Sequence, residues 1–326
     1  MTAIKIGIVG AGYIGNVHAK ILSRDERVRL TAVYDLVPER AQACADAYGA
    51  RAVQSVEALI EMVDAVYVTT PNTQHVDIAL KAIAARRHVF CEKPLATSLD
   101  EARCLLQASR QHRQVFQVGH NRRFAPVYQH VKRLIGQAPL RPHSVHAKMN
   151  RGELLNPAWT GDPSVTGGYL YETPVHIFDM LRWLFGDVES MIVHATSHEY
   201  PEMDDFSLLL RFRSGLHATL ATAADASWHF PFERLEVFCH HATIETQQME
   251  RVLYTASLDA QTITHGFEHL DKEERWGYIQ EDRAFVDAII GGHEAPVTAL
   301  DGYKAVELVD ACYRAARTGE RVQLAA

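Results

Sequence analysis

Residues 4–15 read Ile4-Lys5-Ile6-Gly7-Ile8-Val9-Gly10-Ala11-Gly12-Tyr13-Ile14-Gly15, an apolar run that leads directly into a glycine-rich loop. This spacing of glycines is typical of the first strand, turn and helix of a dinucleotide-binding fold. Gly10 permits the tight turn, Gly12 lets the backbone approach a pyrophosphate, and Gly15 lets the helix pack closely on the strand. Backbone N–H groups at the start of the helix would face the phosphates.

An acidic residue follows the second predicted strand. Asp35 closes the apolar run Leu30–Tyr34 and stands twenty residues after Gly15, where a carboxylate would accept hydrogen bonds from the adenosine ribose. The same carboxylate would repel the additional phosphate of NADP, and the neighbouring Leu36 and Val37 offer that phosphate no positive charge. The sequence therefore predicts NAD as the cofactor, with NADP less favoured.

Length and composition limit the classes of partner. The 326 residues suggest two domains, and 47% hydrophobic with 22% charged residues is ordinary for a globular protein. The formal net charge of −7, without a dense Lys/Arg stripe, argues against a nucleic acid or an anionic membrane as partner. No apolar stretch approaches the roughly 18 residues of a membrane span.

Cysteine and histidine usage makes a metal centre unexpected. The five cysteines are odd in number and contain no C-x-x-C pair, which argues against a disulfide framework or a thiolate metal site. His194 and His198 fall in a predicted strand and turn, where residues four apart do not share a face, so no metal is predicted. The N-terminal apolar run is short and broken by Lys5, so we expect a cytoplasmic, reduced location.

Residues 1–119 alternate strand and helix signals. The predicted helices are Tyr13–Ser23, Pro38–Tyr48, Thr73–Ala84 and Leu99–His112, and further apolar runs are Leu30–Tyr34, Ala65–Thr69, His88–Cys91 and Val115–Gly119. Such βαβ repetition predicts an α/β fold, a Rossmann-type doubly wound parallel sheet covered on both faces.

Residues 120–326 show a different pattern, which predicts a second α/β domain with a large, open, mostly antiparallel sheet. The predicted strands are Ser144–Met149, Ser190–Ser197, Phe206–Phe212, His217–Ala223 and Arg234–Phe238. The predicted helices are Ala125–Ile135, Leu170–Leu184, Trp276–Ile290 and Asp301–Ala316, of which the closing two are free to pack back on the first domain.

Four motifs carry a resemblance to a known family. Glu92-Lys93-Pro94 follows the run His88–Cys91 at the sheet edge where open α/β sheets place their ligands. The other three are Thr70-Pro71-Asn72-Thr73-Gln74-His75, Val118-Gly119-His120-Asn121-Arg122-Arg123-Phe124, and Gly167-Gly168 followed by Glu172-x-x-x-His176-x-x-Asp179. With the glycine loop, the chain resembles the glucose–fructose oxidoreductase/inositol dehydrogenase/rhizopine catabolism (Gfo/Idh/MocA) family over nearly its whole length.

The resemblance implies an enzyme that oxidises or reduces a secondary alcohol or carbonyl of a sugar, inositol or related small molecule with NAD or NADP. It implies Lys93, Glu172 and His176 as the catalytic set, a cis Lys93–Pro94 peptide, and a homodimer or homotetramer formed through the C-terminal sheet. The implied cofactor-binding residues are Gly10, Gly12, Tyr13, Ile14, Gly15, Asp35, Thr70, Pro71, Asn72, His75, Glu92 and Lys93. Glu172 departs from the aspartate of most members; it keeps the charge and adds one methylene.

The chemistry explains these residue types. An alcohol holds its proton tightly near neutral pH, and a histidine such as His176 can remove it as hydride leaves the carbon. The Lys93 cation would stabilise the developing alkoxide, and Glu172 would orient both groups. Residues four apart share one helix face, so we expect a helix starting near Leu170 or Tyr171, with Glu172 and Pro174 in its first turn.

Substrate contacts are weaker expectations. The candidates are Asn121, Arg123, Asn150, Arg151, Trp159 and Asp179. Arg123 could equally form a surface salt bridge, and Asp179 could hold the imidazole of His176 or bond to the backbone. Lys93 could be a surface lysine and His176 a satisfied core histidine, although the motifs favour function.

Three functions are compatible with these residues. The favoured one is an NAD-dependent dehydrogenase of a sugar or cyclic polyol. The second uses bound NAD transiently to cleave a glycosidic bond without net redox change. The third is a non-catalytic NAD-binding regulator, which would have no need for a base and an alkoxide stabiliser.

Overall fold

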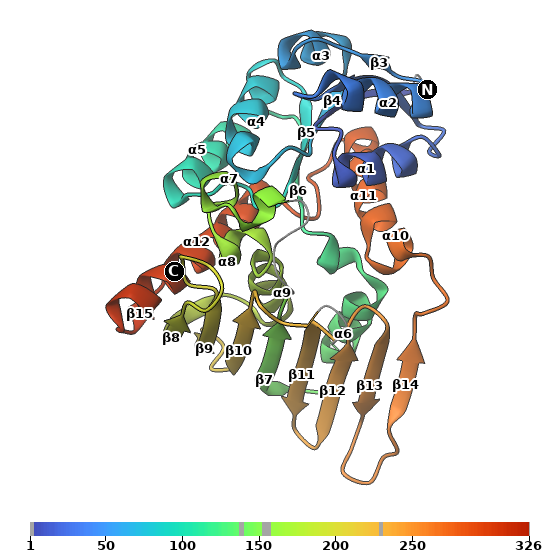
Figure 1. The fold of residues 1–326 in the computed structure, drawn as a ribbon. Coiled ribbons are helices and arrows are strands. Elements are labelled where there is room, and N and C mark those ends of the chain that lie inside the picture. Colours follow the sequence, from blue (N-terminus) through green and yellow to red (C-terminus); the bar gives the residue numbers. More distant parts are fainter. Residues whose placement is uncertain (1–2, 137–139, 152–157, 228–230, 326) are drawn as a thin grey trace. The chain divides into compact units, whose positions relative to one another are not determined.

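The structure is a computed structural model that describes residues 3–136, 140–151, 158–227 and 231–325. The chain forms two compact units (Figure 1). The first contains the chain up to His120 together with Tyr278–Val306, and the second contains Asn121–Gly277 and the chain from Glu307 onward. Helix α11 (Tyr278–Gly291) and the start of α12 (Ala299–Thr318) thus belong to the first unit.

The first unit is built on a six-stranded parallel sheet of order β3-β2-β1-β4-β5-β6. Its strands are β1 Ile4–Val9, β2 Val28–Tyr34, β3 Arg51–Ala52, β4 Ala65–Val68, β5 His88–Glu92 and β6 Phe116–Gly119. The strand order reverses between β1 and β4, and ligands of open α/β sheets bind beyond the carboxyl ends of the strands at such a point. This confirms the predicted Rossmann-type sheet.

Helices complete the first unit. They are α1 Tyr13–Leu22, α2 Pro38–Tyr48, α3 Val56–Met62, η1 Asn72–Gln74, α4 His75–Ala84, α5 Leu99–Arg110, α11 Tyr278–Gly291 and α12 Ala299–Thr318, the last of which ends in the second unit. Ile6, Tyr67 and Phe90 of the strands pack with Phe285 and Val286 of α11 in one fully buried cluster. The parallel strands therefore share their hydrophobic core with α11, a helix from the C-terminal part of the chain.

The second unit is built on a nine-stranded sheet of order β14-β13-β12-β11-β7-β10-β9-β8-β15. Its strands are β7 Pro142–Met149, β8 Val188–Thr196, β9 Asp205–Phe212, β10 His217–Ala223, β11 Glu233–Cys239, β12 Ala242–Gln247, β13 Arg251–Thr255, β14 Ile263–Gly266 and β15 Val322–Gln323. Neighbouring strands are antiparallel except for the parallel pair β7–β10. The predicted, mostly antiparallel sheet is confirmed.

One face of this sheet is covered. Along β9, Phe206, Leu208, Leu210 and Phe212 are buried and alternate with more exposed residues. The helices of this unit are η2 Asn121–Phe124, α6 Pro126–Gly136, η3 Ala158–Gly161, α7 Pro163–Thr166, α8 Tyr169–Glu172, α9 Val175–Phe185 and α10 Lys272–Arg275, together with the end of α12.

The five cysteines are all free. Cys104 on α5 is exposed, and the other four side chains, Cys44, Cys91, Cys239 and Cys312, are buried. In the part of the chain that the structure describes, no helix is long and apolar enough to cross a membrane.

Candidate functional site

The glycine loop has the geometry that close approach to a pyrophosphate requires. Gly10 has φ +100°, and a Cβ there would lie 2.7 Å from the carbonyl of Thr69. A Cβ on Gly15 would lie 2.0 Å from the carbonyl oxygen of Gly10, so the helix could not pack this closely with any other residue. A Cβ on Gly12 would meet nothing within 4 Å, and Gly12 caps α1 without a side-chain hydrogen bond. This open helix start, without a side-chain hydrogen bond at its cap, fits the phosphates of a dinucleotide.

Asp35 lies beside this loop. Its Oδ2 accepts a hydrogen bond from the backbone N–H of Ala11 at 2.7 Å, and its Oδ1 accepts one from Val37 at 2.8 Å. These bonds fix the carboxylate next to the loop, while each oxygen retains a further lone pair. That the remaining lone pairs bind the ribose stays a prediction.

The segment after β5 is held by a neighbouring buried histidine. The Lys93–Pro94 peptide is cis, as the family resemblance implied. His75 is buried, and its two ring nitrogens lie 2.7 Å from the carbonyl oxygen of Pro94 and 2.9 Å from that of Thr70. Burial lowers the pKa of His75, whereas the two backbone carbonyls raise it. A neutral imidazole carries one N–H and donates to only one of these carbonyls at a time. His75 therefore joins the chain after β4 to the chain after β5; contact of these segments with the cofactor stays a prediction.

Glu92 and Lys93 are linked to each other and to a residue that the sequence patterns did not single out. The backbone N–H of Lys93 donates to Oε2 of Glu92 at 3.1 Å. Oε1 of Glu92 lies 3.1 Å from Nε2 of His18, on the buried face of α1. The signal that could have found His18 is a polar side chain within the buried stripe that also contains Gly15 and Leu22.

In the second unit, Glu172 and His176 lie on two short helices rather than one. Glu172 is the last residue of α8, and α9 begins at Val175 with Pro174 as its N-cap. The expected single helix, with Glu172 and Pro174 in its first turn, is therefore wrong. The physical reason is that Pro174 lacks an N–H and its ring would clash with the carbonyl of Leu170. Both Glu172 and His176 are buried.

Arg151 is the predicted residue that the structure places next to Glu172. Its Nη1 lies 3.7 Å from Oε1 of Glu172 and donates to Oγ1 of Thr173 at 3.1 Å. The backbone of Arg151 is fixed to β10, since its N–H donates to the carbonyl of Ala223 at 2.8 Å. The guanidinium can therefore restrain the Glu172 carboxylate from the break between the two helices.

The other substrate-contact candidates lie in the same unit. Arg123 forms a buried two-point ion pair with Asp179, with Nε and Nη2 at 2.8 and 2.6 Å from the two carboxylate oxygens. The side chain of Asn121 donates to the carbonyl of Trp276 at 2.9 Å, whereas Asn150 bonds through its backbone to Phe232. Trp159 on η3 is 37% exposed. Substrate contact by these side chains stays a prediction.

Two protein-family models together match nearly the whole chain. Residues 4–120 match the GFO_IDH_MocA model, described as oxidoreductase family, NAD-binding Rossmann fold. Residues 132–324 match its partner model, described as oxidoreductase family, C-terminal alpha/beta domain.

The chain is similar over nearly its whole length to proteins named inositol 2-dehydrogenase. Inositol 2-dehydrogenase of Ralstonia nicotianae is 32% identical over 347 residues, covering 99% of this chain and 97% of the relative. That of Rhizobium meliloti is 28% identical over 333 residues, covering 99% of both. The structure of a putative myo-inositol dehydrogenase from Sinorhizobium meliloti matches with a TM-score of 0.85 at 26% identity, covering 99% of this chain and all of that one. The chain thus belongs to the Gfo/Idh/MocA family and is an NAD-dependent oxidoreductase with an NAD-binding Rossmann domain.

Proposed function

We propose that the protein transfers a hydride between NAD and a secondary alcohol or carbonyl of a sugar, an inositol or a related cyclic polyol. The observation that carries this proposal is the full-length similarity to inositol 2-dehydrogenases in a chain that also has Lys93, Glu172 and His176 at the family's motif positions. A chain that only sensed NAD would have no need for these three groups together.

Each of the three residues has a role that its chemistry suits. When bound, NAD supplies the acceptor for the hydride that leaves the carbinol carbon. His176 takes the hydroxyl proton, and the ammonium group of Lys93 stabilises the negative charge that develops on the oxygen. Glu172 orients these groups. Arg151, 3.7 Å from Glu172, restrains the carboxylate of this longer side chain.

The cofactor would be held by the glycine loop and the sheet edge beside it. Backbone N–H groups at the start of α1 suit the pyrophosphate, because Gly12 leaves the approach open. Asp35 would accept hydrogen bonds from the ribose hydroxyls and disfavour the extra phosphate of NADP. Replacement of Asp35 by serine is therefore expected to narrow the preference for NAD over NADP.

The deciding experiment mixes the protein with NAD, or separately NADP, and a panel of inositols, aldoses, sugar acids and anhydrosugars, and follows the absorbance of reduced nicotinamide. We expect one substrate group to react with NAD. Lys93→Ala and His176→Ala should each lower kcat by about 10²–10³-fold, whereas Lys81→Ala, on the exposed surface of α4, should not. Unchanged kcat in both site variants would contradict the proposal.

A second function is favoured by one relative. 2,7-Anhydro-N-acetylneuraminate hydratase of Escherichia coli is 28% identical over 309 residues, covering 91% of this chain and 82% of the relative. A redox-neutral reaction of this kind predicts product formation from an anhydrosugar without net accumulation of NADH. Silence of the absorbance assay together with product detected by mass spectrometry would establish it. Tight NAD binding without any product would instead favour a regulator.

We also propose assembly through the nine-stranded sheet. Ile192 on β8 and Leu209 on β9 are register partners and are 38% and 45% exposed, so they form an apolar contact on the outer face. Light scattering should show a homodimer or homotetramer, and Leu209→Asp should dissociate it. A monomeric wild-type protein would contradict this. The expected cytoplasmic location also stays a prediction, to be tested by cell fractionation.

A further inference from the structure

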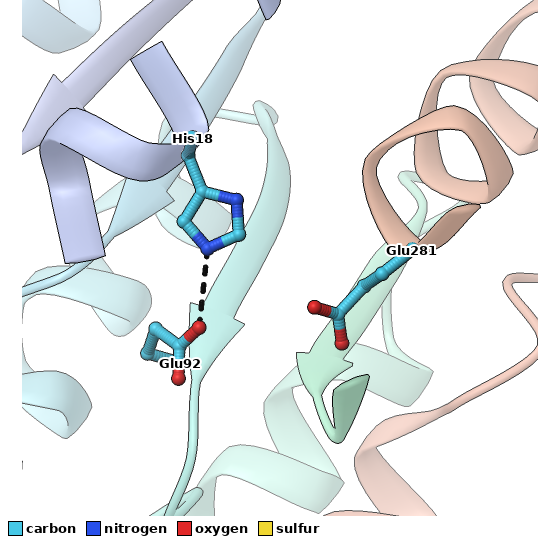
Figure 2. Close-up of side chains that lie close together, drawn as sticks. All are labelled: His18, Glu92 and Glu281. Carbon is cyan, nitrogen blue, oxygen red and sulfur yellow. Dashed lines mark hydrogen bonds and ion pairs between the residues drawn. The ribbon is translucent and has the colours of Figure 1, made fainter. Parts of the chain in front are cut away.

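His18 is buried among carboxylates in the first unit. Its side chain is fully buried on α1, and its Nδ1 lies 2.8 Å from Oδ1 of Asp282 on α11. Its Nε2 lies 3.1 Å from Oε1 of Glu92 at the end of β5, the contact drawn in Figure 2. Glu281 of α11 faces the same space. One imidazole thus connects the helix that starts at the glycine loop, the strand that leads to Lys93, and a helix from the end of the chain.

The geometry favours a cation at this position, between two carboxylates. A neutral imidazole carries one N–H, so it cannot donate to Asp282 and Glu92 together, whereas an imidazolium can. Burial by itself would lower the pKa of His18, but Asp282 and Glu92 outweigh burial and raise the pKa to about 10. Burial would also raise the pKa of Glu92, and the hydrogen bond and charge of His18, together with the charge of Lys93, hold it below its usual value.

Aromatic rings enclose the imidazolium. The ring centroids of Phe90, Tyr67 and Tyr278 lie 4.9, 5.3 and 6.0 Å from that of His18. Water is excluded by these rings, which strengthens the interaction of the imidazolium with Glu92 and Asp282. The cation therefore lies in a buried environment of low dielectric.

The carboxylate of Glu92 is fixed from two further sides. Its Oε2 accepts the backbone N–H of Lys93 at 3.1 Å. The neighbouring strand leaves room for it only because residue 119 is glycine, since a Cβ there would lie 2.9 Å from both Cδ and Oε1 of Glu92. Register pairs Glu92 with Gly119 across β5 and β6. A change at either His18 or Gly119 would therefore move the carboxylate that holds Lys93.

We propose that His18 is a positioning residue for Lys93: it fixes the Glu92 carboxylate, which fixes the backbone N–H of Lys93. The connection also joins Lys93 to α1, whose first turn belongs to the glycine loop. This inference rests on the proposed role of Lys93 in the reaction. The ligand atoms of His18, Glu92 and Glu281 lie within 4.8 Å of one another, but both nitrogens of His18 are already bonded to carboxylates, so we assign the cluster to ion pairing rather than to a metal.

The first test measures the histidine itself, without substrate. Nitrogen NMR of protein labelled at histidine should show both ring nitrogens of His18 as N–H from pH 6 to 9, with the signals assigned by their loss in His18→Gln. A neutral imidazole at pH 7, or a stoichiometric metal ion whose removal changes the His18 signals, would overturn the proposal. This result does not depend on the assignment of Lys93.

The second test measures the consequence for Lys93. In His18→Gln, which keeps N–H donors but carries no positive charge, hydrogen exchange at the amide of Lys93 should accelerate. We expect kcat to fall about 10-fold, with KM and the dissociation constant of NAD little changed, and His18→Leu to lower kcat about 100-fold. Gly119→Ala should lower kcat with His18 intact. His293→Gln, at an exposed histidine of the same unit, is the control.

The outcomes separate the two proposals. If Lys93→Ala retains kcat, the proposed role of Lys93 fails, and the proposed function fails with it if His176→Ala also retains kcat. The NMR result still reports whether His18 is a cation. The positioning role is overturned if Lys93→Ala abolishes activity while His18→Gln and Gly119→Ala keep the wild-type kcat. In that outcome, hydrogen exchange at the Lys93 amide also remains as slow in these two variants as in the wild type. If His18→Leu does not fold, His18→Gln and Gly119→Ala carry the test.

Discussion

The two units both bury charged groups, but they use different cations. In the first unit the buried cation is the imidazolium of His18, between Asp282 and Glu92. In the second it is the guanidinium of Arg123, paired at two points with Asp179. A guanidinium remains charged at any pH at which a protein folds, whereas an imidazolium can lose its proton. The ion pair of His18 in the first unit is therefore sensitive to pH, whereas the Arg123–Asp179 pair of the second unit keeps its cation.

A second guanidinium strengthens the contrast. Nη2 of Arg122 lies 3.3 Å from Oε2 of the buried Glu233, and its guanidinium carbon lies 5.0 Å from the ring centre of Trp276. Glu233 also accepts a hydrogen bond from the hydroxyl of Tyr128. The second unit thus surrounds its buried carboxylates with groups whose charge or hydrogen bond does not change near neutral pH.

The largest expected effect comes from breaking one of these guanidinium pairs. Arg123→Leu leaves the carboxylate of Asp179 buried without its cation and should lower the free energy of unfolding by about 3–5 kcal/mol. Urea unfolding followed by tryptophan fluorescence measures it. The double variant Arg123→Leu/Asp179→Leu should recover much of this loss. A double variant no more stable than the single one would show that shape, not charge, dominates this site.

The corresponding change in the first unit should cost less. His18→Leu at pH 7 is expected to lower the free energy of unfolding by about 1–3 kcal/mol, because Asp282 can take up a proton when its cation is removed. Burial already raises the pKa of Asp282 against the opposing charge of His18. The same urea experiment checks this value. If His18→Leu lowered the free energy of unfolding as much as Arg123→Leu, the buried imidazolium and the buried guanidinium would not differ in their contribution to stability.

The effect of pH on stability through His18 should be smaller still. The pKa of His18 in the folded protein is raised from 6.5 to about 10, so its contribution to stability is complete below pH 6.5 and is lost as the pH rises towards 10. We expect the free energy of unfolding to fall by about 1–2 kcal/mol between pH 7 and 10. The neighbouring carboxylates make this loss smaller than the shift of the His18 pKa alone would give. Urea midpoints across this range should decline in the wild type and in Arg123→Leu, but much less in His18→Gln. If the urea midpoint of His18→Gln declined with pH as steeply as that of the wild type, groups other than His18 would cause the pH dependence.

The smallest effect is expected at an exposed ion pair. Nζ of Lys81 lies 3.0 Å from Asp77 and 3.1 Å from Glu57, but all three side chains are largely exposed. Water and salt screen such pairs, so Lys81→Met should leave the urea midpoint unchanged within error. A clear shift would mean that burial is not what separates the strong pairs from the weak ones.

The elements of the first unit were predictable where local residues mark both ends. Helix α2 has the predicted bounds Pro38–Tyr48, because a proline occupies its first turn and Gly49, with φ +69°, ends it. Helix α3, Val56–Met62, was not predicted, because seven residues are too few to show a helical period. Its one local signal is Ser55, whose side chain caps the helix by accepting from Ala58.

The strands β12, β13 and β14 were not predicted, and their turns explain why. The chain turns from β11 to β12 through His240 and His241, and His241 has φ +56°. The chain leaves β12 through Gln248, with φ +51°. Hairpin turns are usually recognised by glycine or asparagine at such positions, and neither turn has one. Packing in the sheet therefore overrides the local preference of these residues.

The candidate site was predictable to the extent that it lies in contiguous motifs. Glycine spacing and Glu92-Lys93-Pro94 are visible in the sequence, and the cis peptide followed from the resemblance. The partner of His18 was not, because Asp282 lies 264 residues away and neither residue belongs to a motif that names the other. Long-range pairs of this kind are decided by which side chains the completed fold brings together.

The uneven exposure of the cysteines makes this chain convenient for site-specific labelling. Burial raises the pKa of Cys44 and Cys239 to about 11, and raises that of Cys91 and Cys312 further. These four thiols are shielded from reagents and hold little thiolate, whereas Cys104 on α5 is open to solvent. A maleimide dye added to the native protein should therefore attach at one position, and a fluorescent reporter can be placed on the first unit without removing any cysteine.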